Sequence, residues 1–579
     1  MTARHDDSAQ AAGAAAEAVP RPPGSEGIAG PRWPLLIPAV LSVGFLWLWP
    51  HLFFEDATGI HSGSRTVWAD FAIHLTYAQR FAQFPPGLWF DHQPLYFGAP
   101  FDYPFITGLI SGLLLRATDS EVVAMLAPSM VAAAALPWLV YGFLRVTDLR
   151  PSWAAAGTLV FYLAGGLGWT TVLSGGTYTP PVLEASMVEG TLFKFGRLVH
   201  LLLPQRALQF GLPLGLLVII GLARWLRSSQ KAGDGNPPIG FQILLGCAAG
   251  LLFSVHVHSF LAVAAASAAM LGVALAPWPP GGSDAGALHR LRWVAGFAPF
   301  AIAASAVSLG LYFYFAGEVR EGFLHPDPGW LANDFLSWLG LWWANGGIFY
   351  FAAAYALFTP RLWRSRVALS LSLAGWILFG ALNLVRFQPW DWDNTKLELW
   401  AFLLLLPAVM LLMQSWWNAR KARPAVLLVL FSLLPTGMLD LHHLVSFERH
   451  TYRLWSAEQQ QLARRFRDLA EPVDLVVVAD RAHDWVSALA GRQILLGWIG
   501  SLWAYGIDTT ERRAEVRTIF QGGERAADLL GRYDVRWVVI DDDARRNYQA
   551  DETFFANRFR LALRQGDTRI YEVPPDPGQ

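Results

Sequence analysis

Charged residues and cysteines are both scarce in this chain. Only 15% of its 579 residues are charged, whereas soluble domains carry about 25%. The single cysteine, Cys247, excludes a disulfide within the chain, so the cysteine content does not indicate the compartment. The formal net charge of −1 provides no bulk positive field. We therefore expect no nucleic-acid partner.

Apolar residues take the place of the missing charge. They make up 54% of the sequence, and the mean hydropathy is +0.33. Over this length such an excess is more than one core can hold, and lipid is the natural solvent for it. The sequence therefore predicts a polytopic α-helical protein of the cell (plasma) membrane, surrounded by membrane lipids.

A helix needs about 20 apolar residues to cross the hydrocarbon core. Eleven segments meet this requirement: 34–52, 121–144, 152–172, 207–226, 239–255, 259–277, 294–316, 337–358, 367–385, 397–416 and 424–441. A further apolar segment, 104–115, begins at Pro104 and is too short to span. We expect it to form an interfacial helix in the first outer loop.

The positions of Lys and Arg orient the predicted spans. If 104–115 does not cross, five basic segments fall on the side of Arg32: 145–150, 224–231, 290–292, 361–366 and 420–423. The positive-inside rule makes that side cytoplasmic. We thus expect a disordered cytoplasmic tail at 1–33, a transmembrane domain at 34–444 and a large outer loop at 53–120.

Residues 445–579 differ from the rest of the chain in their pattern of apolar and polar residues. Runs rich in Val and Ile at 473–480, 492–498 and 535–543 are typical of buried strands, and segments of helical spacing lie between them. This alternation predicts a small α/β domain, and the span count places it on the extracytoplasmic side. The domain has no P-loop, dinucleotide fingerprint or nucleophile elbow. We expect a structural or substrate-shaping cap rather than a second active site.

The first candidate site lies in the first outer loop. Asp70, His74 and Tyr77 are spaced i, i+4 and i+7, so they share one face of a predicted helix. Such a helix would lie flat at the membrane interface, with carboxylate and imidazole side by side. In the alternative interpretation, Asp70 is a helix N-cap and His74 is a solvated neighbour.

The same loop continues into a stretch rich in proline and aromatic residues, 92–105. This composition predicts a fixed, non-helical sequence of turns. Asp91, His92 and Asp102 lie at or within it. A rigid loop with these side chains suits a polar substrate, and it equally suits a loop that is simply well packed.

Two further candidates stand at the ends of predicted spans. Arg206 follows Pro204 at an outer mouth, where an Arg binds a phosphate group or extends to the lipid headgroups. His256 and His258 lie between two spans with no polar loop to separate them. Two histidines are too few for a metal site, so substrate binding and hydrogen bonding within the bundle both stay open.

The fourth candidate is a short outer loop crowded with charge. It contains Arg386, Asp391, Asp393, Lys396 and Glu398. The Asp-Trp-Asp triplet has the form that holds a divalent ion, Mg or Mn, between a diphosphate and a protein. Arg386 and Lys396 could instead grip a lipid phosphate, or the charges could form a solvated loop that closes on itself.

Taken together, these features resemble the GT-C superfamily, whose members take a sugar from a polyprenyl-phosphate donor, as protein O-mannosyltransferases and aminoarabinose transferases do. The likeness rests on Asp70 in WADFAIHL, the HQPLYFGAPFDYP stretch, the non-crossing segment 104–116, and Arg145 and Arg150 after the next span. LLPQRALQFG, HVHSF, WDNTKLELW and AGRQILLGWIGSLWAYGID resemble a prokaryotic branch of such proteins.

This resemblance implies an inverting hexosyl or pentosyl transfer on the outer face, with a glycan, lipid or protein as the acceptor. Asp70 would be the general base, and Arg206, Arg386 or Lys396 would stabilise the departing phosphate. The implied substrate-binding residues are His74, Asp91, His92, Asp102, Arg206, His256, His258, Arg386 and Lys396. Asp391 and Asp393 would hold a divalent cation, although the first loop has Asp70 in place of the paired acidic motif of better-known members.

Two other classes of function fit a chain of this kind. A transporter or flippase of a lipid-linked substrate should show internal repeats and broken helices near the membrane midplane. No repeat relates the two halves of the sequence, and the polar candidates gather at one membrane face. A non-catalytic assembly protein of the same fold would keep these loops without the activity.

Overall fold

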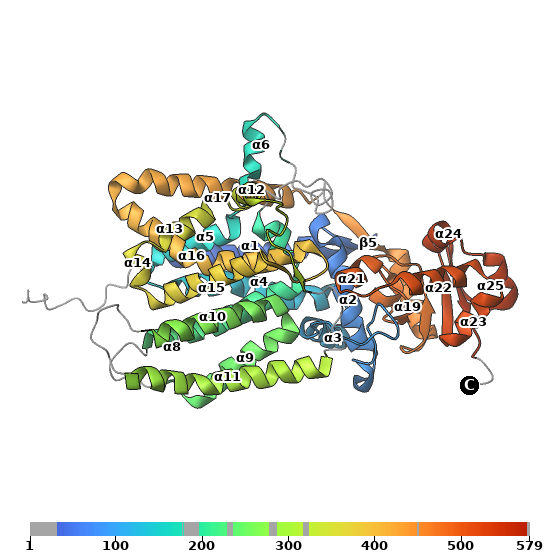
Figure 1. The fold of residues 1–579 in the computed structure, drawn as a ribbon. Coiled ribbons are helices and arrows are strands. Elements are labelled where there is room, and N and C mark those ends of the chain that lie inside the picture. Colours follow the sequence, from blue (N-terminus) through green and yellow to red (C-terminus); the bar gives the residue numbers. More distant parts are fainter. Residues whose placement is uncertain are drawn as a thin grey trace, which may run out of the picture.

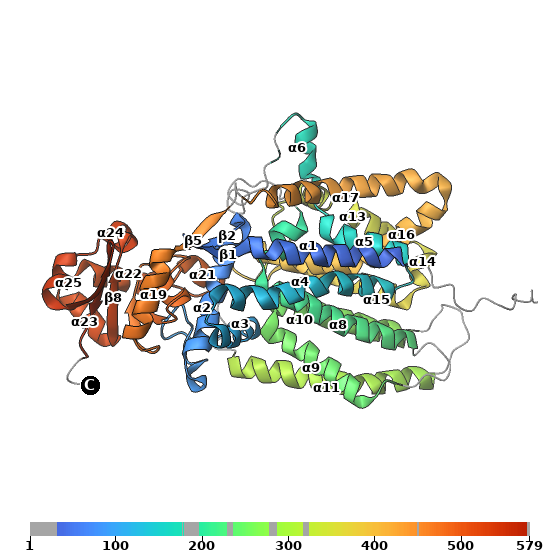
Figure 2. The same ribbon diagram turned by 180° about the vertical axis from the view of Figure 1, so that it is seen from behind.

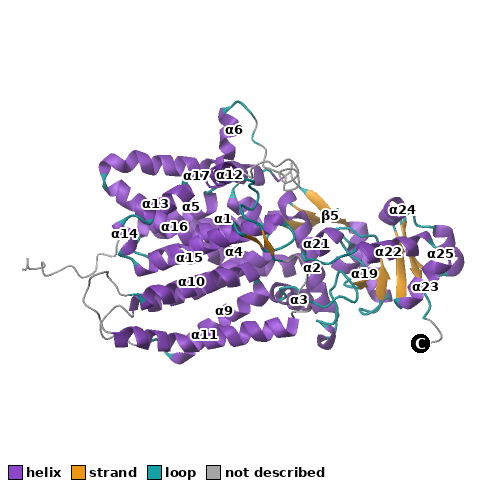
Figure 3. Ribbon diagram, viewed as in Figure 1, coloured by secondary structure: helices purple, strands orange, loops and turns teal. Residues whose placement is uncertain are grey.

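The computed structural model describes residues 32–176, 178, 196–228, 236–276, 287–315, 324–447 and 451–575. The long apolar helices between residues 33 and 447 run side by side in a bundle (Figure 1). The strands gather at one end of this bundle (Figure 3), which we call the sheet-facing end. The view from behind shows the same arrangement (Figure 2).

Seven helical stretches in the described part of the chain are long and apolar enough to cross a membrane. They contain α1 (Leu36–Leu52), α4 (Glu121–Arg145), α8 (Arg206–Ser228), α10 (Val257–Leu275), α11 (Ala287–Phe315), α16 (Asn394–Asn418) and α17 (Arg423–Leu444). The apolar stretch of α16 is buried throughout, so this helix forms the centre of the bundle. The chain is a multi-pass membrane protein.

The other four predicted spans form shorter helices. They are α5 (Pro151–Leu163), α9 (Ile239–Val255), α15 (Arg366–Leu382) and the pair α12 (Phe335–Gly346) and α13 (Phe349–Ala356). The break between α12 and α13 falls at Gly347, which adopts a positive φ of 52°. Because each of these helices falls below about 20 residues, the number of eleven crossings stays a prediction.

The first outer loop folds onto the region that follows the last helix of the bundle. It contains β1 (Phe53–Asp56), β2 (Gly59–Ser62), α2 (Trp68–Gln83) and α3 (Ile106–Thr118). Strands β1 and β2 form a hairpin, and β2 pairs antiparallel with β5 (Tyr452–Ser456). At the crossing of β2 and β5, a Cβ on Gly59 would lie 2.0 Å from the Trp455 carbonyl oxygen, so only glycine fits. This three-stranded sheet joins segments about 400 residues apart.

Helix α2 is more deeply buried than a helix lying flat at the interface. Its polar side chains His74, Thr76, Gln79 and Arg80 are all buried. Gln79 donates a hydrogen bond to the Leu489 carbonyl oxygen over 2.9 Å. His74 is therefore not the solvated neighbour of the alternative interpretation, because other parts of the protein cover this face of α2.

The C-terminal region contains a five-stranded sheet in the order β7-β6-β8-β10-β9. The three runs predicted as strands contain β6 (Leu475–Val477), β7 (Gln493–Ile494) and β8 (Val535–Ile540), which run parallel. The hairpin of β9 (Arg560–Gln565) and β10 (Thr568–Glu572) adds two antiparallel strands. Helices of this region include α19 (Ala457–Leu469), α21 (Ile499–Ala504), α22 (Thr510–Gln521), α23 (Glu524–Arg532), α24 (Asp542–Tyr548) and α25 (Glu552–Arg558).

Candidate functional site

One face of α2 builds the first wall of the candidate site. Tyr77 stacks on Tyr103 with ring centroids 4.2 Å apart, and the His74 ring lies 6.1 Å from Tyr103. His74 is buried, and its Nδ1 atom has no hydrogen-bond partner among the described residues. Asp70 lies one turn earlier on this face. The i, i+4, i+7 spacing thus places Asp70, His74 and Tyr77 on a surface that packs against protein.

The second wall is the start of α16. The Lys396 Nζ atom lies 2.9 Å from the Asp393 Oδ1 atom, and the two side chains are only 12% and 5% exposed. Both charges act on Asp70: Lys396 favours its ionised form and Asp393 opposes it. A site of one cation and two carboxylates therefore forms from the first outer loop and the start of α16.

Asp70 is half-buried as a residue. Desolvation by the surrounding protein raises its pKa to about 7, with Lys396 as the main opposing influence. A carboxyl group with a pKa near neutrality can accept a proton and release it again at physiological pH. This is the property that a general base requires.

His74 behaves in the opposite way. Burial lowers its pKa well below the usual range, and the positive charges of Arg206 and Lys396 lower it further. The imidazole is therefore neutral at physiological pH. A neutral ring can donate one hydrogen bond to an anion without adding charge to the site.

His256 and His258 bring two more imidazoles towards Lys396. His256 is extended, with φ −164° and ψ 105°, and it separates α9 from α10. Its Nδ1 atom accepts a hydrogen bond from the Ser259 backbone N–H over 3.2 Å, so it caps α10. The Nε2 atoms of both rings are buried without a partner among the described residues. Both rings lie within the electrostatic influence of Lys396, so these free nitrogens border the site.

Arg206 is held by the short helix α3 and does not extend to the lipid headgroups. Its Nη1 atom donates to the Thr107 carbonyl oxygen over 3.2 Å, and its Nη2 atom donates to the Ser111 hydroxyl over 2.6 Å. The guanidinium is buried, and its Nε atom has no partner in the described part of the chain. Its charge acts on His74 and Tyr103, so Arg206 belongs to the same cluster.

The C-terminal region supplies a side chain that the sequence analysis did not assign. Tyr505 follows α21, which lies beside α2 in both views (Figures 1 and 2). Its ring meets Tyr103 edge-on at 5.1 Å, and the two hydroxyls are hydrogen-bonded. Burial raises the pKa of both phenols, so both stay protonated. The only signal for Tyr505 was its place in the AGRQILLGWIGSLWAYGID segment.

Solved structures share this architecture. The archaeal oligosaccharyltransferase AglB from Archaeoglobus fulgidus, in complex with an inhibitory peptide and a dolichol-phosphate, matches at 13% identity with a TM-score of 0.50, over 88% of this chain and 69% of that one. The apo form of the Archaeoglobus fulgidus oligosaccharyltransferase matches at 13% identity with a TM-score of 0.52, over 88% and 70%. The chain has the GT-C fold.

At these identities the likeness concerns the fold alone. ArnT from Cupriavidus metallidurans bound to undecaprenyl phosphate also matches, at 12% identity with a TM-score of 0.46, over 94% of this chain and 98% of that one. No protein-family model and no curated protein matches the sequence.

Some of the site residues predicted from the sequence lie outside the cluster around Asp70 and Lys396. Arg386 forms an ion pair with Asp391 at 2.7 Å, and the two side chains are 29% and 31% exposed. Its strand β4 (Val385–Arg386) pairs with β3 (His325–Pro326). The Trp330 indole N–H donates to the Asp391 carbonyl oxygen over 3.0 Å. This ion pair thus closes a surface loop.

In the aromatic stretch of the first loop, only some of the side chains contact the cluster around Asp70 and Lys396. Asp91 is exposed, and His92 packs on Phe97 with ring centroids 4.8 Å apart. Burial, and then the charge of Arg80, lower the pKa of His92. Asp102 is half-buried next to Tyr103. Of this stretch, Tyr103 has the direct ring contacts with His74 and Tyr505, while roles for Asp91, His92 and Asp102 stay predictions.

The Asp-Trp-Asp triplet is a poor fit for a metal ion. Asp391 is paired with Arg386 and Asp393 with Lys396, so each carboxylate already faces a cation. Across the described residues, no three His, Cys, Asp or Glu side chains are grouped so that they could share a metal ion. A divalent cation at Asp391 and Asp393 stays a prediction.

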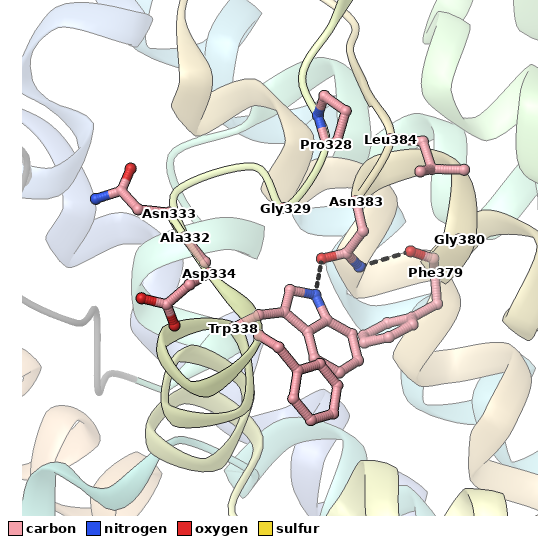
Figure 4. Close-up of a pocket in the computed structure, with 11 residues that line it drawn as sticks. Pro328, Gly329, Ala332, Asn333, Asp334, Trp338, Phe379, Gly380, Asn383 and Leu384 are labelled. Atoms are coloured by element: carbon pink, nitrogen blue, oxygen red, sulfur yellow. Dashed lines mark hydrogen bonds between the residues drawn. The ribbon is translucent and has the colours of Figure 1, made fainter.

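A pocket on the GT-C fold lies away from this cluster. It has a volume of about 470 Å³ and opens between the start of α12 and the end of α15 (Figure 4). Trp338 and Phe379 line it, and the Trp338 indole N–H donates to Asn383 over 2.7 Å. None of the predicted site residues lines this pocket.

Proposed function

We propose that the chain is a membrane glycosyltransferase that moves a sugar from a polyprenyl-phosphate donor to an acceptor on the extracytoplasmic face. One observation carries the proposal: a carboxyl group with a raised pKa lies within the electrostatic influence of a lysine that is only 12% exposed, at the sheet-facing end of a GT-C fold. The carboxyl group can accept the proton of an acceptor hydroxyl, and the lysine can stabilise the charge of a departing phosphate.

In the proposed reaction, Asp70 accepts the proton of the acceptor hydroxyl. The acceptor oxygen forms a bond to the anomeric carbon, and the bond from that carbon to the phosphate oxygen breaks. The polyprenyl phosphate leaves with the bonding electrons and gains negative charge. Lys396 and Arg206 stabilise that charge, while the neutral His74 ring and the rings of His256 and His258 offer nitrogen atoms as hydrogen-bonding groups.

The donor class is supported by the fold and by the charge of the site. AglB, which shares the fold, was solved with a dolichol-phosphate and a peptide. A phosphate at Lys396 would lie near the membrane edge, where a polyprenyl tail can stay in lipid. The acceptor is a glycan, lipid or protein, and the transferred sugar is a hexosyl or pentosyl group.

The proposed topology has eleven crossings, a cytoplasmic N-terminus and an extracytoplasmic C-terminal domain. It divides the chain into a tail at 1–33, most of which lies outside the described residues, a transmembrane domain at 34–444 and an α/β domain at 445–579. The first outer loop and the C-terminal region lie at the same end of the bundle, while α14 (Pro360–Trp363) lies at the other (Figure 1). This arrangement supports one shared side for the candidate site and the C-terminal domain.

The decisive experiment compares the purified protein with Asp70→Asn in nanodiscs. Labelled polyprenyl-phosphate sugars are the donors, and a membrane extract supplies the acceptor. Loss of the base should reduce transfer by about 10²- to 10⁴-fold, while binding of undecaprenyl phosphate persists. Asp119→Asn is the matched control, because this carboxylate lies in the same outer loop, is 88% exposed and has no predicted role in the site.

The opposing result separates the alternatives. If the intact protein transfers no sugar from a broad donor panel but moves lipid-linked substrate across vesicles, a flippase replaces the glycosyltransferase. If it does neither, the chain is a non-catalytic protein of the same fold.

A further inference from the structure

A buried ion pair lies inside the bundle, next to the candidate site but outside it. The Arg197 Nε atom donates to both carboxylate oxygens of Glu398, at 3.0 and 3.2 Å. The side chains are 3% and 7% exposed. The Tyr350 hydroxyl donates a further hydrogen bond to Glu398. The Arg197 guanidinium also lies 4.3 Å from the centre of the Phe402 ring, one turn further along α16. Arg197 therefore grips α16 at two successive turns.

The position of Glu398 on α16 gives this contact a consequence for the site. Lys396 precedes Glu398 by two residues, and two residues correspond to about 200° around a helix. Lys396 and Glu398 therefore project from nearly opposite sides of the same turn. The pair with Arg197 fixes how this turn is rotated about the helix axis, and that rotation decides where Lys396 points.

Arg197 also begins the segment that leads to Arg206. The π-helical turn Leu198–Leu202 follows it, and α8 begins at Arg206. The Gln209 side chain donates to the Leu203 carbonyl oxygen over 2.6 Å and so ties this segment to α8. One ion pair thus links the helix that carries Lys396 to the segment that carries Arg206.

We propose that Arg197 and Glu398 are positioning residues that hold Lys396 and Arg206 so that both cations converge on one phosphate group. The inference rests on the proposed function, because the phosphate is that of the lipid donor. Neither residue touches the substrate. The pair acts through the rotation of the first turns of α16 and through the place of the segment before α8.

The first test needs no substrate. The double variant Arg197→Met with Glu398→Leu removes the pair without leaving a buried charge, a replacement that folded proteins often tolerate. Acylation of Lys396 by an amine-reactive reagent is followed by mass spectrometry, with the exposed Lys421 as the internal reference. We expect Lys396 to react at least threefold faster in the variant and Lys421 to react at its original rate.

The second test uses undecaprenyl phosphate as the probe. Its affinity for the double variant in nanodiscs should fall about tenfold. Tyr350→Phe removes only the hydroxyl that bonds Glu398, so it keeps the fold and should produce a smaller change in the same direction in both tests. Arg545→Met is the control, because it removes a partly exposed pair between α24 and α25, far from the bundle (Figure 1).

The outcomes separate this inference from the proposed function. Unchanged Lys396 reactivity in both the double variant and Tyr350→Phe overturns the positioning role. Faster labelling in a protein whose native form binds no undecaprenyl phosphate supports the positioning of Lys396 and overturns the lipid-phosphate donor. If the double variant fails to fold, Tyr350→Phe alone decides: unchanged labelling contradicts the inference.

Discussion

Two ion pairs in one short segment differ in their exposure to solvent. Arg386 and Asp391 are about one-third exposed, whereas Lys396 and Asp393 are almost enclosed. A surface pair contributes only about 0–1 kcal/mol because water screens it. The ammonium group of an enclosed lysine is poorly hydrated. Its attraction to a phosphate group is therefore weakly screened by water. Enclosure thus separates Lys396, the cation proposed to face the phosphate, from Arg386, which closes a loop.

The largest effect should come from removing the enclosed cation. Lys396→Met keeps the length of the side chain and deletes its charge. We expect kcat to fall about 10²- to 10³-fold, as it does when a group that stabilises developing charge is lost. Single-turnover transfer from a polyprenyl-phosphate sugar measures this. A loss below threefold would mean that Lys396 does not face the departing phosphate.

The protonation of Asp70 should make the rate of transfer depend on pH. Only the ionised carboxylate can accept the acceptor proton, and the pKa of Asp70 is raised to about 7. The kcat/KM value should therefore rise about tenfold per pH unit below neutrality and level off above it. Asp70→Asn should show a low and flat profile. A profile in the native protein that is flat from pH 5 to pH 8 would contradict the role of Asp70 as base.

Replacing Asp70 should lower the activity but raise the thermal stability of the fold. Because the folded pKa is raised, the folded protein keeps this proton up to about pH 7, whereas the unfolded chain releases it earlier. The contribution to stability is present below the unfolded pKa and is lost as the pH rises through 7. Relative to the native protein, Asp70→Asn should gain in Tm between pH 5 and pH 8. Thermal unfolding followed by tryptophan fluorescence measures the difference.

A smaller effect is expected at the contact with the C-terminal region. Tyr505→Phe removes the hydroxyl that bonds Tyr103 and leaves the ring contact in place. One buried hydrogen bond contributes about 0.5–1.5 kcal/mol, so we expect a three- to tenfold rise in KM with a smaller change in kcat. Titration of acceptor at saturating donor separates the two constants. Tyr533→Phe, in the C-terminal sheet region, serves as the control.

The smallest effect belongs to the exposed pair. Arg386→Met should change kcat less than threefold and stability by about 1 kcal/mol or less. The same transfer and unfolding measurements apply. If Arg386→Met costs as much as Lys396→Met, enclosure is not what distinguishes the two cations.

Parts of this arrangement could be predicted from local spacing. Asp70, His74 and Tyr77 share a face because helical periodicity dictates it, and three strands follow from Val-rich runs of the right length. The charged loop was also recognised as a candidate. The division of its charges was not, because the local pattern does not encode which side chain faces the bundle and which faces water.

Other parts depend on contacts between distant segments. Tyr505 meets Tyr103 across some 400 residues of chain, and nothing near either residue predicts the other. The sequence does not single out Arg197, because an arginine near the end of a span usually extends to the membrane interface. The burial of α2 was missed for the same reason: the region that covers its polar face lies at the far end of the sequence.

The sheet of β1, β2 and β5 has a consequence for biogenesis. In the proposed topology, the hairpin and Asp70 are exported with the first outer loop, soon after synthesis begins. Strand β5 and Tyr505 are exported only after the final crossing has been inserted. For most of its synthesis, the nascent protein would therefore carry Asp70 on the extracytoplasmic side without the C-terminal partners, and the proposed site would be complete only after the segment with Tyr505 has been exported.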